Sequence, residues 1–185
     1  MKDKIRSERG ALDDTFMTII AIFVSVTLLF IVPLMTLADR TDDTVQLAVS
    51  TATSEFVGNI RTKGKLTLDD YNRFYSTIQA TGNTYDVEME LKILDENPGK
   101  KTMQSNYAVI GENVYYSVYT NQIESVISSA PNYYPLKEGD MVSVSVKNTN
   151  TTLSQSLKGF LYKVTGNSNY IIFASAAGIV AVNSQ

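Results

Sequence analysis

Acidic side chains are the residues whose type and spacing come nearest to a chemical site in this sequence. They stand side by side or two positions apart at Asp13–Asp14, Asp42–Asp43, Asp69–Asp70 and Glu88 with Glu90. Glycosidases hold two carboxyl groups roughly 5 to 9.5 Å apart in a cleft, and Glu88 and Glu90 on one strand face would fall within that range. The alternative is a solvated strand face, on which Lys92 balances the acids. We favour the solvated face.

Cysteine and histidine are both absent, which excludes disulfides, thiolate and imidazole metal ligands, cysteine nucleophiles and Ser-His-Asp catalysis. The sequence also contains no Gly-x-Ser-x-Gly elbow, no phosphate-binding Gly-Lys-Ser/Thr loop and no Gly-x-Gly-x-x-Gly fingerprint. The acidic turn Asp95 to Gly99 lacks the ligand spacing and the closing Glu of a calcium loop. We therefore predict a protein that is not an enzyme, with no catalytic residue, no metal site and no cofactor.

Residues 16 to 38 form an apolar run without a charged side chain. As a helix rising about 1.5 Å per residue, this run would be roughly 35 Å long, enough to cross a hydrocarbon core about 30 Å thick. Four basic residues precede it, and basic flanks stay in the cytoplasm. We therefore expect a single-pass membrane protein with a cytoplasmic N-terminus and an extracytoplasmic head. A cleaved secretory signal is the alternative, although its apolar region spans only about 7 to 15 residues.

The residues ahead of the apolar run form a short charged leader that ends at Gly10. Asp13 and Asp14 stand between Gly10 and Phe16, which opens the run. The segment from residue 6 to residue 16 has the sequence RSERGALDDTF, which resembles the prepilin-peptidase site of type IV pilin-like proteins. More specifically, it resembles the TadE-like pseudopilins of tight-adherence pilus and related secretion systems. In these proteins an Arg-Gly-Ala-like junction is followed by an acid and Phe.

The resemblance implies a processing site and an assembly site. Cleavage by prepilin peptidase would follow Gly10 and make Ala11 the first residue of the mature chain. In the family an acid, usually fifth in the mature chain, is thought to neutralise the amino terminus of a neighbouring subunit. Here Thr15 takes the fifth place, so Asp14 in the fourth is the assembly candidate, together with Phe16. Loss of residues 1 to 10 would remove four basic and two acidic side chains and change the formal charge from −3 to −5.

Asp13 and Asp14 also have an interpretation that involves no pilin. Acids are favourable at the start of any helix because the N-terminal end of the helix dipole is positive. An unpaired carboxylate inside lipid costs about 2.5 to 3.5 kcal/mol on insertion scales, so unpaired acids belong at the membrane interface. The motif alone leaves both interpretations open.

The segment after the apolar run is expected to continue as an amphipathic stalk helix. Apolar residues recur every three or four positions from Val45 to Ile60, which is the pattern of one buried helix face. Pro33 removes one backbone hydrogen bond and is expected to bend the helix inside the apolar run. Residues 39 to 43 form either a helical turn or a loosened joint between the two halves.

Further helices are marked by caps and glycines. Gly64 is a natural stop for the stalk helix. Thr67 is a predicted N-cap with Asp70 three positions later, a near capping box, and Gly82 ends the helix that follows. Two short helices are expected later in the chain, one from Asn121 with Glu124, and one carrying Leu153, Leu157 and Leu161.

Strands are indicated where the apolar period changes to two. Alternation predicts a half-buried strand from Tyr85 to Ile93, a second strand region from Tyr107 to Tyr119, and a third in which Val142, Val144 and Val146 share one face. The last apolar stretch, Tyr170 to Val182, is too short to span a membrane. We expect it to be a central buried strand, with Gly178 marking a bulge or a close approach.

These elements predict an α+β fold. A long N-terminal membrane-spanning helix continues into the stalk helix and is followed by a small head with an antiparallel sheet and short helices. The expected divisions are a leader at 1–10, the membrane and stalk helix at 11–64 and the head at 65–185. Tyr133 and Tyr134, in the loop from 130 to 140, are expected to pack on their own head rather than to recognise a partner.

Two functions of different classes fit these features. In the first, the chain is a pilin-like structural subunit whose partners are membrane lipid, other pilin-like subunits and prepilin peptidase, and whose head is exposed on a cell-surface filament or secretion machine. In the second, it is an uncleaved single-span protein whose outer domain binds a wall polymer, peptide or protein. The pI of about 5.0 and the lack of a basic cluster beyond the leader argue against nucleic acid as a partner.

Overall fold

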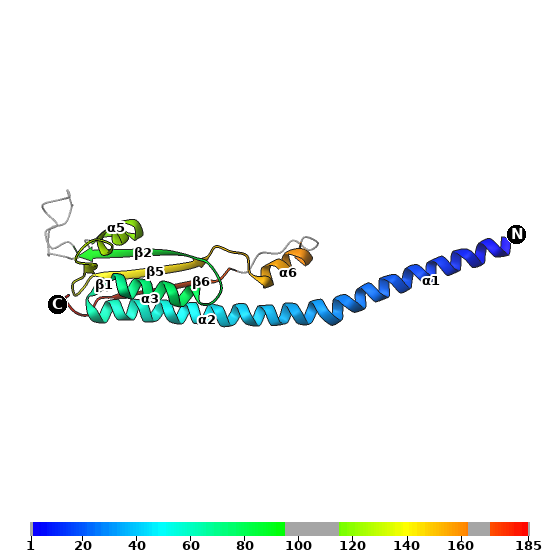
Figure 1. Cartoon of the computed structure of the whole chain (residues 1–185), viewed down its shortest axis with the longest axis horizontal. Helices are drawn as coiled ribbons and strands as arrows, with labels where there is room; N and C mark the ends of the chain where they lie inside the picture. The colour runs from blue at the N-terminus through cyan, green and yellow to red at the C-terminus, as the bar shows by residue number, and fades with distance from the viewer. Residues whose placement is uncertain (1, 95–114, 163–170, 185) are drawn as a thin grey trace. The chain divides into compact units, whose positions relative to one another are not determined.

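The computed structural model describes residues 2–94, 115–162 and 171–184, with side chains described for 14–94, 115–159 and 171–184 (Figure 1). Residues 95–114 and 163–170 contain the predicted turn after Ile93 and the start of the second predicted strand region, which therefore lie outside the described residues. The described elements are, in chain order, α1 Lys2–Val26, the π-helix η1 Thr27–Ile31, α2 Val32–Lys63, β1 Lys65–Thr67, α3 Leu68–Gln79, β2 Tyr85–Leu94, β3 Tyr115–Tyr119, α5 Thr120–Ile127, β4 Tyr133–Pro135, β5 Met141–Asn148, α6 Leu153–Tyr162 and β6 Phe173–Ile179. This is an α+β architecture with a long N-terminal helical segment.

Chain contacts divide the protein into two compact units. The first contains residues 1–42 and 152–169, and the second contains residues 43–151 and 170–185. Residues 43–63, which the sequence assigns to the stalk, thus belong to the same unit as the sheet. Of the two alternatives for residues 39 to 43, the helical turn is the one observed, because α2 runs through these residues as helix.

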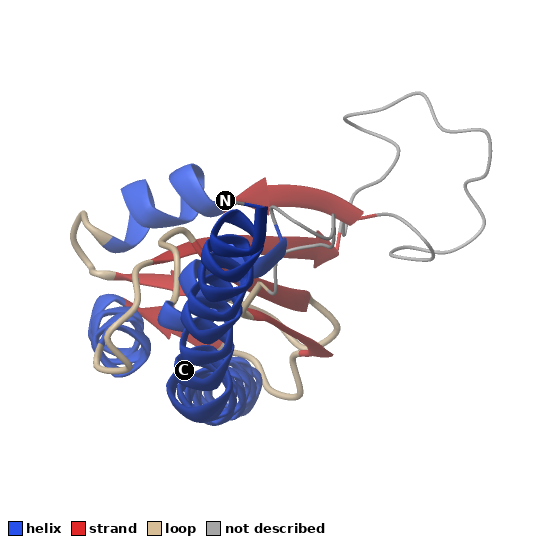
Figure 2. Cartoon of the chain, turned by 90° about the vertical axis from the view of Figure 1, so that its right-hand side faces the viewer, coloured by secondary structure: helices blue, strands red, loops and turns tan. Residues whose placement is uncertain are grey.

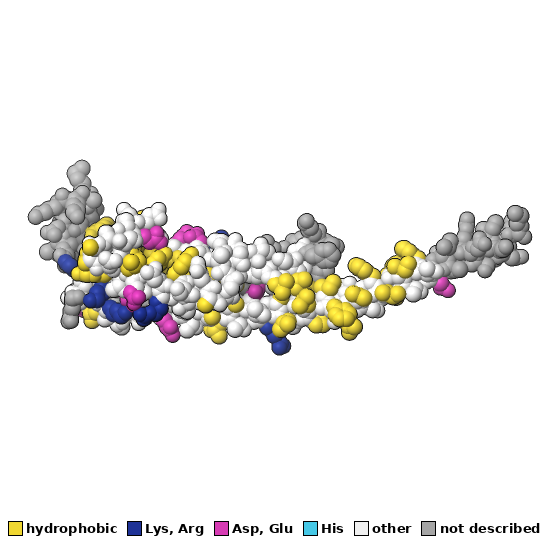
Figure 3. Space-filling view, viewed as in Figure 1, with side chains coloured by type: hydrophobic (Ala, Val, Ile, Leu, Met, Phe, Trp, Pro, Cys, Tyr) yellow, Lys and Arg dark blue, Asp and Glu magenta, His cyan; other side chains and the backbone are white. Residues whose placement is uncertain are grey.

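The apolar run is helical and exposed along almost its whole length. Its helix is long and apolar enough, by length and composition, to cross a membrane. Hydrophobic side chains cover this part of the surface (Figure 3), and Phe16, Phe23 and Phe30 are each more than 60% exposed. Thr18, Thr27 and Thr36 donate their hydroxyl hydrogens to the carbonyl oxygens four residues earlier, at 2.7, 2.9 and 3.1 Å. The helix therefore satisfies these hydroxyls internally, as an apolar solvent requires.

Regular α-helix is interrupted within the apolar run, next to the proline. The π-helical turn η1 ends at Ile31, two residues before Pro33. Proline has no N–H to donate to the preceding turn, and a local π-turn is one way in which a helix accommodates such a break. The predicted distortion thus takes the form of a π-helical turn.

Four strands form an antiparallel sheet in the order β3-β2-β5-β6. The strands lie side by side in Figure 2. The inner face of the sheet carries the alternate apolar residues of β2 and β5, such as Leu91 and Val144, which are fully buried. The predicted strands at Tyr85 and Val142 are confirmed, with β2 running to Leu94 and β5 to Asn148.

The final strand differs from its prediction. Among the described strands β6 pairs only with β5, so it lies at the edge of the sheet rather than at its centre. Helix α2 covers parts of its free edge: the Gln46 side chain exchanges two hydrogen bonds with the Phe173 backbone, at 2.6 and 3.0 Å, and Arg61 Nε donates to the Ile179 carbonyl at 2.8 Å. The predicted close approach at Gly178 is confirmed, because a Cβ there would lie 2.5 Å from Arg61 Cδ.

The core of this unit lies between the inner sheet face and the helices α2 and α3. The predicted stripe of α2 is confirmed, since Val49, Phe56 and Ile60 are buried. The ring of Phe56 stacks on that of Phe74 in α3, with centroids 4.3 Å apart and planes inclined by 5°. This aromatic pair fixes the two helices against each other.

The end of α2 is tied to distant parts of the chain. Gly64 has φ +65° and accepts a hydrogen bond from the Leu136 amide at 2.8 Å. Immediately after it, β1 pairs with β4, so the predicted loop at 130–140 contains a short strand. The predicted cap of α3 is confirmed: Thr67 Oγ1 accepts from the Asp70 amide at 3.1 Å. Helix α5 begins at Thr120, one residue before its predicted start, with Gln122 rather than Glu124 bonding the Tyr119 amide, at 3.1 Å.

Candidate functional site

The four residues predicted to act in processing and assembly all lie in α1. Gly10 and Ala11 are helical, and only the backbone is described at these two positions. Asp14 is exposed, and its carbonyl oxygen accepts the Thr18 hydroxyl. Phe16 is 63% exposed. Asp14 and Phe16 thus lie on an exposed helical surface. Within the described part of the chain, no contact of their side chains with other segments is seen.

The helix-dipole interpretation of Asp14 is wrong for the uncut chain. Helix α1 starts at Lys2, so Asp14 lies well inside it, whereas the favourable dipole effect is confined to the first turn. If the chain were cut after Gly10, Asp14 would become the fourth residue and would lie in the first turn of the shortened helix. The helix dipole would therefore favour the Asp14 carboxylate only in a chain that has been cut after Gly10.

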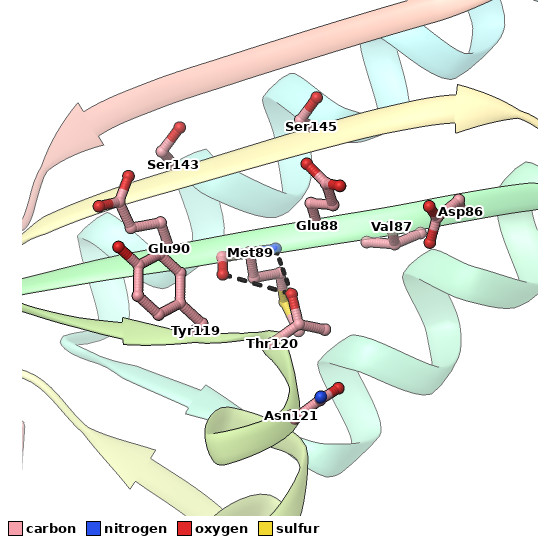
Figure 4. Close-up of a pocket in the computed structure, with 10 residues that line it drawn as sticks. All are labelled: Asp86, Val87, Glu88, Met89, Glu90, Tyr119, Thr120, Asn121, Ser143 and Ser145. Carbon is pink, nitrogen blue, oxygen red and sulfur yellow. Dashed lines mark hydrogen bonds between the residues drawn. The ribbon is translucent and has the colours of Figure 1, made fainter.

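A second candidate surface is the outer face of the sheet, opposite the core. Asp86, Glu88 and Glu90 alternate along β2 on this face, and Ser143 and Ser145 lie beside them on β5 (Figure 4). Together with residues from β3 and α5 they line a hollow of about 540 Å³. The small serine side chains form its floor, so the hollow is broad and polar.

The acids of this face are not arranged as a catalytic pair in a closed cleft. Glu88 is exposed, and the half-buried Glu90 accepts a hydrogen bond from Ser117 Oγ at 2.7 Å. Thr120 Oγ1, at the rim, accepts from the Met89 amide at 2.7 Å and so continues the hydrogen bonding where β3 ends. Among the described residues no group of three acids is placed to hold a metal ion. The arrangement suits binding of an extended polar or cationic group more than acid–base chemistry.

The outer sheet face continues into a more apolar hollow of about 350 Å³. Lys92, Met141 and Ile179 line it beside Glu90, and the register pairs Lys92 with Met141 and Met141 with Ile179. The outer face thus changes from acidic to apolar along the strands.

The tyrosines of the 130–140 segment pack on their own head. Tyr133 and Tyr134 are half-buried, Tyr134 packs against the core, and Lys65 Nζ lies 5.8 Å from the centre of the Tyr133 ring. Burial raises the pKa of Tyr134, with smaller contributions from Tyr116 and Asp140. Tyr119, by contrast, is 60% exposed and lines the rim of the acidic hollow.

A polar junction between α2 and α6 was missed by sequence reasoning. Asp39 Oδ1 lies 2.5 Å from Lys158 Nζ and also accepts the Ser154 hydroxyl. One turn later, Asp42 Oδ2 accepts the Thr152 hydroxyl at 2.7 Å, and both residues are buried. Thr152 and Gln155 form a capping box, in which the side chain of each accepts from the backbone amide of the other. Their three-residue spacing is the signal in the sequence that marks the start of α6. Nothing in the local pattern pairs this helix with Asp39.

Comparison of the chain with protein-family models, with curated proteins and with solved structures gave no match. The functional argument therefore depends on the surfaces described above.

Proposed function

We propose that this protein is a pilin-like structural subunit of the TadE type, anchored in the membrane by its N-terminal helix and exposing an α+β head outside the cell. The observation that carries the proposal is the exposed apolar surface of residues 16–38 on a helix whose later part builds the core of the head. A continuous apolar helical surface of this length has to be covered by lipid or by other helices. A pilin-like subunit uses both, lipid before assembly and neighbouring subunits after it.

The leader sequence supports cleavage after Gly10. Removal of residues 1–10 would eliminate Lys2, Lys4, Arg6 and Arg9, which hold the N-terminus in the cytoplasm. It would also place Asp14 in the first helical turn. A carboxylate there can pair with the new amino group of a neighbouring subunit, which offsets the cost of holding the acid at lipid depth.

The mass of the mature N-terminus tests the proposal. Coexpression with an active prepilin peptidase is expected to yield a chain that begins at Ala11. A Gly10→Val variant is expected to remain uncut, while Ser7→Ala in the same leader is the matched control and is expected to be cut normally. A chain that keeps Met1 or Lys2 in the presence of peptidase that cleaves a known substrate would contradict the proposal.

Assembly is tested separately from cleavage. Asp14→Asn is expected to be processed normally and to lose crosslinking between subunits in the membrane, because its neutral amide cannot balance an amino group. Asp43→Asn, which removes an exposed acid beyond the apolar run, is the control and is expected to retain crosslinking. Equal crosslinking of the two variants would remove Asp14 from the proposed assembly site.

The outer sheet face favours a second candidate function, an uncleaved membrane-anchored binding protein. Its acidic hollow of about 540 Å³ is large enough for a segment of an extended polymer or peptide. This candidate requires an intact N-terminus, so the same mass measurement separates the two. It also predicts that Glu88→Gln with Glu90→Gln weakens binding of a cationic peptide without changing membrane anchoring.

A further inference from the structure

Helix α6 is attached to the residue at which the apolar run ends. Asp39 directly follows Ala38 and is the first charged residue after the run. Its carboxylate contacts both Ser154 and Lys158, which lie one turn apart on the same side of α6. Asp42, one turn further along α2, holds Thr152 at the N-cap of α6. These contacts place the beginning of α6 at the level of residues 38 to 42 of the long helix.

The level of Asp39 is also the level of the membrane surface when residues 16–38 span the bilayer. A charged residue at the end of an apolar span lies among the lipid headgroups. Leu34 and Leu37, in the last turns of the run, are 44% and 62% exposed, so lipid has to reach this height. Pairing of Asp39 with Lys158 neutralises both charges at this boundary.

Ser154 and Lys158 bond to Asp39 of α2, whereas Gln155 and Ser156 bond to the backbone of Thr152 at the start of α6. Leu153 is 59% exposed, and Leu157, four positions later on the same side, is half-buried. A leucine of this exposure in water is unremarkable alone. At the boundary of an apolar span, an exposed leucine such as Leu153 continues the apolar surface of the anchor.

We propose that α6 is an interfacial helix whose Leu153 and Leu157 rest on the lipid surface around the anchor. The partner is the headgroup and upper acyl region of the bilayer. Thr152 bonds to Asp42 and Lys158 bonds to Asp39, so α6 runs antiparallel to α2 and Leu153 lies at the level of the lipid headgroups. It braces the exit of the long helix, since Asp39 and Asp42 fix α6 to it. This inference rests on the membrane anchoring in the proposed function, and does not depend on cleavage of the leader.

Site-directed nitroxide labelling tests the placement. The sequence contains no cysteine, so Leu153→Cys, Leu34→Cys and Ser175→Cys each give a single labelled position in the full chain. Each labelled protein is reconstituted into vesicles of phosphatidylcholine and phosphatidylglycerol, and the accessibility of the nitroxide to oxygen and to a water-soluble nickel chelate is measured. Leu34 reports the anchor, and Ser175, an exposed residue of β6, reports a position in water.

The expected result is that the label at Leu153 is less accessible to the nickel chelate than the label at Ser175 and lies at the level of the headgroups, shallower than the label at Leu34. A label at Leu153 that is as accessible to the nickel chelate as the label at Ser175, while Leu34 remains in lipid, overturns the interfacial placement and leaves the anchor intact. Aqueous labels at both Leu34 and Leu153 overturn the anchor itself. Leu153 is exposed, so its substitution leaves the folding of the head unaffected.

Discussion

Replacement of Gly64 by alanine is predicted to weaken the head far more than the same change at Gly82. Both glycines have positive φ, +65° and +86°, a conformation that costs an L-residue roughly 1 to 2 kcal/mol. Around Gly82 an added Cβ would have no atom within 4 Å, whereas at Gly64 it would lie 2.5 Å from the Val182 carbonyl oxygen. Gly82→Ala therefore measures only the cost of a positive φ in alanine. The difference between the two variants measures the cost of the contact between the added Cβ and the backbone of Val182.

The extra cost at Gly64 follows from what has to move. The atoms in the way belong to the backbone at residues 182–184, so no side-chain rotation relieves the contact. Separation of the two segments breaks hydrogen bonds that join the end of α2 to the C-terminal segment, among them Ala181 N to Arg61 O at 3.0 Å and Arg61 Nε to Ile179 O at 2.8 Å. At about 0.5 to 1.5 kcal/mol for each bond, two or three lost bonds add about 1 to 4 kcal/mol.

Urea unfolding of the full chain in detergent micelles measures both variants, with the tyrosine near-ultraviolet circular dichroism as the signal. We expect Gly82→Ala to lower the free energy of unfolding by about 1 to 2 kcal/mol, and Gly64→Ala by about 2 to 6 kcal/mol once the broken bonds are added. The larger loss is a substantial part of a domain stability of about 5 to 15 kcal/mol. Equal losses for the two variants would refute the reasoning, because they would mean that the C-terminal segment does not pack on the end of α2.

Three further predictions concern the packing of α2, α3 and α5. Phe74→Ala removes the ring stacked on Phe56 and should lower the free energy of unfolding by about 3 to 5 kcal/mol, measured by the same urea titration. Burial raises the pKa of Asp70, but hydrogen bonds from Lys63 and Thr67 outweigh it and leave the pKa below the usual 3.8. The ionised carboxylate therefore stabilises the head above about pH 4, and this stabilisation is lost as the pH falls through the lowered pKa. Lys63→Ala should cost about 1 kcal/mol at neutral pH, and the difference from wild type should shrink on acidification; a constant difference would exclude the ion pair as its cause. Burial and the Glu124 carboxylate raise the pKa of Tyr71, so its stabilising effect should be lost as the pH rises above about 10, and Tyr71→Phe should flatten that alkaline loss in a thermal melt.

Local patterns were sufficient to predict much of the fold. The three- and four-residue spacing from Val45 to Ile60 predicts which side of α2 enters the core, because a helix brings such residues to one face. The alternation in β2 and in β5 predicts their buried faces in the same way. The spacing of Thr67 and Asp70 predicts the start of α3, since the hydroxyl and the amide it caps are three residues apart.

The sequence indicated the N-terminal candidate residues and the acids Glu88 and Glu90, but not the hollow in which these acids lie. Gly10, Ala11, Asp14 and Phe16 follow from a contiguous motif, which a sequence displays directly. The acidic hollow needed the register of β2 with β3 and β5, which no single strand encodes. The order of the strands likewise comes from long-range pairing, and for this reason β6 was expected at the centre of the sheet and lies at its edge.

The sequence by itself determined that a charge-free helical run long enough for a bilayer precedes an α+β head without cysteine or histidine, because length, hydrophobic period and composition are properties of neighbouring residues. Only the tertiary structure decided that Asp39 meets Lys158, that Gly64 lies under the backbone of Val182, and that Gln46 and Arg61 cover parts of the free edge of β6. Each of these contacts joins segments that are more than a hundred residues apart in the sequence. Their partners are selected by packing of the whole core, which local sequence patterns do not specify.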